Sequence, residues 1–174
     1  MAENGVAKVA ELVERATICM LTTMTADGRH LARPMALQEV EFDGDLWFFA
    51  ASDSPKVDQI RSNPQVNVSF SNDKQSEWTS IAGVAEVVDD RAKAEQLWSP
   101  VLKVWFPDGV DTPELILIKV HAESAEYWSS PSSKLVRLID GIRAAVTKDP
   151  DKFPAENEEV TLPDNARSRP PRTS

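Results

Sequence analysis

The segment 46–71 alternates strand, helix and strand, and this pattern restricts the fold more than any other part of the sequence. Residues 46–50 (LWFFA) are apolar and aromatic, which predicts a buried strand. Ser54 then stands at the N-cap position of a short helix, with Pro55 in its first turn. An Asn-Pro pair ends that helix, and the alternating residues 65–70 predict another strand.

The start of this short helix carries groups that favour an anion. It combines hydroxyls at Ser52 and Ser54, the backbone N–H groups of a first turn and the Lys56 ammonium. The helix dipole, the donors and the positive charge all attract a phosphate-sized anion. The simpler interpretation is a capped helix beside a solvated lysine, since capped short helices are common.

Length and charge narrow the classes of function. The chain has 174 residues, which predicts one domain, and a net charge of −9, which disfavours nucleic acid or an anionic membrane as the main partner. No apolar run approaches the roughly 18 residues of a membrane span. The acidic N-terminal residues are not typical of a signal peptide, so a cytoplasmic protein is expected.

The single cysteine and the two histidines do not indicate site chemistry. Cys19 lies in an apolar run, where inert packing is its usual role, and one cysteine excludes an internal disulfide. His30 and His121 are far apart in the sequence and lack the spacing of metal ligands, so no metal site is expected.

Periodicity and turn residues predict a sheet of hairpin-connected strands. The expected strands are 16–24, 30–42, 46–50, 65–71, 77–88 and 114–128. Further helices are expected at 4–15, at 89–98 and, capped by Ser132 or Ser133, up to residue 146. Asp-Gly turns join the early strands, Gly83 is a candidate bulge, and 99–113 is a Pro- and Gly-punctuated loop. Since a series of alternating βαβ units and the glycine-rich nucleotide motifs are missing, an antiparallel β-barrel with peripheral helices is expected.

Four stretches carry a family resemblance: TICMLTTMTADGRHLARPM, LWFFAASDSPKVDQIRSNPQVNVSFS, WTSIAGVAEVVDDRAKAEQLWSP with LKVWFPDG, and LILIKVHAESAEYWSSPSS. In this order they resemble the pyridoxamine-5'-phosphate-oxidase-like flavoproteins, and more narrowly the bacterial general stress protein branch, over residues 4–147. The resemblance implies a mainly β (α+β) fold. This fold is a six-stranded antiparallel split β-barrel that binds FMN and spans 1–148. The charged, Pro-rich residues 149–174 are expected to form a tail with little fixed structure.

The resemblance also implies which residues hold the flavin. One segment would run along the isoalloxazine edge with its backbone: Arg33, Pro34, Met35 and Ala36. Arg33 would also approach the ribityl-phosphate region, and Ser52, Ser54 and Lys56 would hold the phosphate. A solvated strand arginine is the simpler interpretation of Arg33, but its position beside Pro34 and the phosphate motif favours the flavin.

Members of this family assemble as homodimers with a flavin at each end of the interface. The resemblance implies that Trp78, Trp105 and Trp128 are contacts supplied from the partner side. Ordinary core or dimer packing is the alternative for each tryptophan.

Departures from the family limit the function that is carried over. Pyridoxamine-phosphate oxidases proper have a C-terminal Arg–His signature, whereas no histidine follows His121 here, so vitamin-forming oxidase activity is not expected. The leading hypothesis is an FMN-binding general stress-type protein acting as a flavin-dependent oxidoreductase of unspecified substrate. The alternatives are a flavin sensor or reservoir without turnover, a deazaflavin-dependent reductase, FAD in place of FMN, and a scaffold without cofactor. No side chain is assigned a catalytic role.

Overall fold

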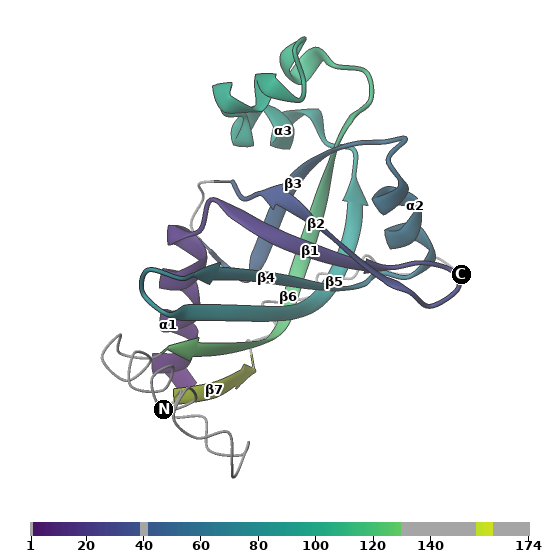
Figure 1. The fold of residues 1–174 in the computed structure, drawn as a ribbon. Helices are drawn as coiled ribbons and strands as arrows, with labels where there is room; N and C mark the ends of the chain where they lie inside the picture. Colours follow the sequence, from purple (N-terminus) through teal and green to yellow (C-terminus); the bar gives the residue numbers. More distant parts are fainter. Residues whose placement is uncertain (1, 39–41, 130–155, 162–174) are drawn as a thin grey trace, which may run out of the picture.

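The computed structural model describes residues 2–38, 42–129 and 156–161, which form one curled sheet with helices around it (Figure 1). The strands are β1 (Ile18–Met24), β2 (His30–Ala36), β3 (Asp45–Ala51), β4 (Gln65–Asn72), β5 (Glu77–Val88), β6 (Leu115–Ser129) and β7 (Glu156–Thr161). The helices are α1 (Ala2–Arg15), α2 (Pro55–Ser62) and α3 (Arg91–Leu97), with 3-10 segments η1 (Pro100–Val104) and η2 (Gly109–Asp111). Figure 1 shows α3 and the 3-10 segments beyond one end of the sheet, and α1 beside β7 near the other.

Every strand pair is antiparallel, and the order is β2-β1-β4-β5-β6-β3. The end strands β2 and β3 contact each other, so the sheet curls into the predicted antiparallel split barrel. The seventh strand, β7, pairs with the second half of β6, and β3 pairs with the first half. The structure therefore differs from the prediction of little fixed structure over 149–174, because the backbone of Glu156–Thr161 completes the ladder of a long strand.

The first hairpin shows how local sequence sets the register. The Thr25 N–H donates to the Arg29 carbonyl oxygen over 2.8 Å, and Gly28 adopts a φ of 83°, which glycine tolerates without steric cost. This turn places Leu21 opposite Arg33 across β1 and β2. The predicted Asp-Gly hairpin is therefore confirmed.

The predicted bulge at Gly83 is also confirmed. The pairing of β5 with β6 shifts register between Ala82 and Gly83. A Cβ atom at Gly83 would lie 2.2 Å from the His121 carbonyl oxygen, so only glycine allows the two backbones to approach this closely. The bulge interrupts two long strands, and such interruptions bend a sheet.

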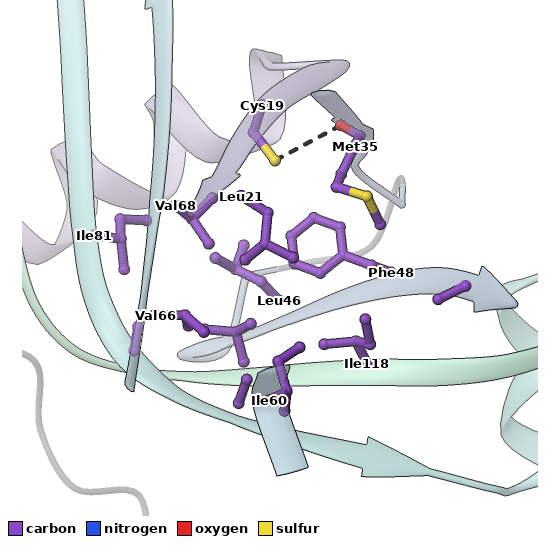
Figure 2. Packing of buried hydrophobic residues seen from close by; sticks show 14 of the residues in the cluster. Cys19, Leu21, Met35, Leu46, Phe48, Ile60, Val66, Val68, Ile81 and Ile118 are labelled. Atoms are coloured by element: carbon purple, nitrogen blue, oxygen red, sulfur yellow. Dashed lines mark hydrogen bonds between the residues drawn. The ribbon is translucent and has the colours of Figure 1, made fainter. Parts of the chain in front are cut away.

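The main core lies inside the curl of the sheet and combines side chains from α1, α2 and β1 to β6. Phe48 is fully buried, and Figure 2 shows its ring within this cluster together with Leu21, Leu46 and Ile118. Side chains along β1 point alternately into the core and outward. Cys19 and Leu21 are buried, whereas Ile18 and Met20 are exposed.

Cys19 is buried on β1 opposite Met35 of β2, and its Sγ donates to the Met35 carbonyl oxygen over 3.6 Å (Figure 2). Burial raises the pKa of the Cys19 thiol to about 12, so the group remains protonated at neutral pH. Because the thiolate is the reactive form, we expect iodoacetamide at pH 8 to alkylate the folded chain at least about a thousandfold more slowly than the unfolded chain. Equal rates in buffer and in urea would show that Cys19 is accessible.

A second apolar cluster attaches α3 and η1 to the outer side of β3. Phe49 points away from Phe48 and forms an edge-to-face contact with Trp98, with ring centroids 5.7 Å apart. Phe106 also packs against Phe49. β3 is thus buried on both faces, and the segment after α3 is fixed beside its end.

Some predicted elements differ or cannot be compared. The second strand ends at Ala36, before the predicted end at 42, and the predicted loop 99–113 contains two short 3-10 segments. The predicted helix up to residue 146 lies outside the described residues, and the proposed limit of the domain at 148 also stays a prediction. Within the described ranges, no helix is both long and apolar enough to cross a membrane.

Candidate anion-binding cavity

A cavity of about 430 Å³ opens between the edge strand β2, the end of β3, the start of α2 and η1. It brings together six of the predicted site residues, which come from three separate parts of the sequence. The predicted residues that line it are Arg33, Pro34, Met35, Ala36, Lys56 and Trp105. The remaining lining residues are Ile18, Gln38, Phe49, Ala50, Ala51, Leu102 and Phe106. Its walls are therefore mainly apolar, with two cations at one end.

The Arg33 guanidinium is fixed by neutral acceptors. Its Nη1 donates to the Thr23 Oγ1 over 2.6 Å and to the Leu21 carbonyl oxygen over 3.2 Å. Its Nη2 donates to the Gln59 Oε1 over 3.1 Å. The Thr23 hydroxyl in turn donates to the same Gln59 oxygen over 2.5 Å. These bonds join β1, β2 and α2 at one point.

Sequence reasoning missed Thr23 and Gln59, although part of the signal was present. The Asp-Gly hairpin sets the register that brings β1 beside Arg33, and Gln59 follows Lys56 at i+3, on the same side of a helix. The contact of α2 with β1 was not predictable from these local patterns. It depends on Val57 and Ile60, which bury α2 against the core.

Ser54 occupies the predicted N-cap position, but its side chain does not cap α2. The hydroxyl instead donates to the Ala51 carbonyl oxygen over 2.7 Å and accepts from the Lys56 Nζ over 3.0 Å. Ser54 therefore contributes to the site by orienting the ammonium of Lys56, while Pro55 starts the helix.

Two cations line this cavity, and neither forms an ion pair with a described residue. Burial lowers the pKa of Lys56, and the positive charge of Arg33 lowers it further, while Asp53 opposes the shift. Burial also lowers the pKa of Arg33. Neither side chain forms an ion pair with any residue that the structure describes. An anionic ligand would relieve both the repulsion and the cost of burial.

Ser52 lies apart from this cavity. It lines a neighbouring cavity with Arg61 and Glu86, and its backbone N–H donates to the Glu114 carbonyl oxygen over 2.8 Å. That N–H group is therefore not free for a ligand. Ser52 and Ser54, which were predicted to hold one phosphate together, therefore have different neighbours.

Much of the cavity lining comes from β2 and from the aromatic segment after α3. Pro34 is tolerated in a strand because β2 is an edge strand, with β1 as its ladder partner in the described chain. Trp105 is 58% exposed and lines the cavity of its own chain, with Phe106 buried behind it. Trp105 therefore lies beside the cavity of its own chain, and the contact implied from the partner side stays a prediction.

Trp78 and Trp128 lie elsewhere on the sheet. They are opposite each other across β5 and β6, and neither lines the cavity. Thr79, the neighbour of Trp78, is buried inside the curl, so strand alternation directs Trp78 and Trp128 to the outer face. The implied partner-side role of these two tryptophans stays a prediction.

Comparison with known proteins places these features in a family. A model of the family described as pyridoxamine 5'-phosphate oxidase like matches residues 4–151. Protein bli-3 of Neurospora crassa is 31% identical over 140 residues, which cover 75% of this chain and 67% of that protein.

Solved structures show the same fold. The general stress FMN/FAD binding protein of Xanthomonas citri has a TM-score of 0.63 and 28% identity, covering 72% of this chain and 88% of that chain. General Stress Protein 26 of Bacillus anthracis has a TM-score of 0.62 and 20% identity, covering 73% of this chain and 95% of that chain. At 20% identity, the likeness to the Bacillus anthracis protein shows the fold alone.

Proposed function

This chain belongs to the pyridoxamine 5'-phosphate oxidase-like family, and on that premise we propose that it binds FMN in the cavity beside Arg33 and Lys56. The general stress relative from Xanthomonas citri is named for FMN/FAD binding, which supports a flavin as the ligand class. We propose further that the chain uses this flavin as an oxidoreductase, and the lone buried cysteine supports a cytoplasmic location.

The observation that carries the proposal is a pair of cations, Arg33 and Lys56, that form no ion pair with any described residue. A phosphate monoester is a dianion near neutral pH, and it matches the combined charge of Arg33 and Lys56. Ser54 orients the ammonium toward this ligand. A neutral ligand would leave both charges unpaired at a half-buried position, so the chemistry favours a phosphorylated cofactor.

The rest of the cavity suits a flat ring system. Met35 and Ala36 line the cavity from β2, and the exposed Trp105 lines it from the segment after α3. When bound, FMN supplies hydride- or electron-transfer chemistry, and the protein supplies orientation and electrostatics. No Asp, Glu or His side chain lines the cavity among the described residues, so no acid–base role is assigned to this chain.

An absorption spectrum of the purified protein tests the cofactor, and heat release followed by chromatography identifies it. We expect a flavin band and released FMN. Release of FAD or a deazaflavin would replace the proposed cofactor, and failure to bind any flavin after reconstitution would contradict the proposal. Anaerobic mixing with NADH and NADPH then separates an oxidoreductase from a sensor or reservoir, which would be reduced slowly by both donors.

We also propose that the chain forms a homodimer through the outer face of the sheet. Ile18 and Met20 on β1 are 51% and 39% exposed, and Pro34 lies opposite Met20 on the same face. Trp78 and Trp128 point to this outer face as well. These side chains are uncharged, although the whole protein has a net charge of −9. An uncharged, partly apolar face of this kind favours burial against a second copy of the chain.

Met20→Asp is expected to convert the dimer to a monomer, because it would place a carboxylate in a desolvated apolar interface. Light scattering after size exclusion measures the mass. The matched control Ala92→Asp adds the same charge at an exposed position on α3 and should leave the dimer intact. A wild-type chain that is already monomeric at micromolar concentration would refute this assembly.

A further inference from the structure

The acceptors that hold the Arg33 guanidinium are all uncharged. Thr23 is 1% exposed and accepts from Nη1, while Gln59 accepts from Nη2 and from the Thr23 hydroxyl. A buried or half-buried arginine is usually satisfied by a carboxylate. Here an amide and a hydroxyl take that place.

The hydrogen-bond inventory of Arg33 identifies the edge that remains for a ligand. A guanidinium has five N–H donors in a plane. Three of them bond to Leu21, Thr23 and Gln59. The Nε–H and the second Nη2–H have no acceptor within the described residues. In a planar guanidinium these two N–H groups lie along one edge, which is suited to bidentate contact with phosphate oxygens.

On the basis of the proposed function, we infer that Thr23 and Gln59 form a neutral cradle that turns this edge of Arg33 to the flavin phosphate while leaving its charge uncompensated. They act as positioning residues, because the cradle contacts Arg33 and not the ring system. A carboxylate at position 59 would hold Arg33 equally well, but would compete with the phosphate for its charge. The cradle thus makes the site selective for a phosphorylated flavin over an unphosphorylated one.

Gln59→Glu tests the cradle with a nearly isosteric change. We expect FMN affinity to fall about 10- to 100-fold, as the new carboxylate neutralises Arg33 and repels the phosphate. Riboflavin affinity should stay unchanged, and the thermal midpoint of the ligand-free chain should not fall. The control Gln96→Glu adds the same charge at an exposed position on α3 and should change neither affinity. Titration calorimetry and differential scanning calorimetry supply these readouts.

Thr23→Val provides a second variant that removes the hydroxyl and keeps the shape. It should lower FMN affinity in the same selective way, by about 3- to 10-fold, since a hydrogen bond to a charged group is lost. Equal losses of FMN and riboflavin affinity in both variants would indicate a purely structural role. FMN binding whose preference over riboflavin survives Gln59→Glu would overturn the cradle alone, whereas a wild-type chain that binds no FMN would overturn the proposed function itself.

Discussion

The double variant Arg33→Met, Lys56→Met is expected to lose FMN affinity by roughly 10²–10⁴-fold, because each hydrogen bond between a charged donor and phosphate is worth about 1.5–3 kcal/mol. Methionine keeps much of the length and apolar volume of both side chains. Riboflavin binding should persist, since the apolar wall at Met35 and Trp105 is unchanged. Titration of both ligands against one protein preparation measures the two effects.

A matched control separates the effect of the two cavity cations from the effect of the protein's net charge. Arg61→Met with Lys74→Met removes the same two charges from exposed positions, and we expect its FMN affinity to equal that of the wild type. If both double variants lost FMN equally, long-range charge would explain the binding. If neither lost it, the phosphate would lie elsewhere.

Phe48→Ala is expected to lower the free energy of unfolding by about 3–5 kcal/mol, a large part of the about 5–15 kcal/mol that stabilises a typical domain. Phe48 is fully buried at the centre of the main core, so truncation removes apolar contact and leaves a cavity. Urea denaturation followed by circular dichroism measures the change. Because β3 also supplies one wall of the cavity beside Arg33 and Lys56, ligand affinity should fall with stability.

Trp105→Ala is the contrasting substitution. Its ring is 58% exposed, so we expect it to change the free energy of unfolding by no more than about 0.5 kcal/mol, as for other surface substitutions. A loss as large as that of Phe48→Ala would mean that the Trp105 ring is packed against the protein and not exposed. Similar stability with altered flavin fluorescence would instead agree with a ring that covers the cofactor.

Local signals predicted much of this fold. The Asp-Gly turn set the register of β1 with β2, and Gly83 marked the bulge, since both depend on short-range backbone geometry. β7 was not predicted because its charged sequence lacks the apolar alternation of a strand. Its pairing is provided by the second half of β6, far away in the sequence.

The candidate site also contains residues that local signals predicted and residues that they did not. Arg33 and Lys56 were found from a turn, a helix start and a family resemblance, and the cavity contains both. Thr23 and Gln59 were missed because their role depends on how α2 packs against β1. Ser52 was grouped with the site because it precedes the helix, but the end of β3 directs it to a different cavity.

Isothermal titration of the wild-type chain, freed of any bound ligand, with FMN and with riboflavin tests whether Arg33 and Lys56 form a phosphate site. We expect FMN to bind at least about 100-fold more tightly, since Arg33 and Lys56 can pair only with the phosphate. Equal affinities for the two ligands, or no binding of either, would contradict a phosphate site built on these cations.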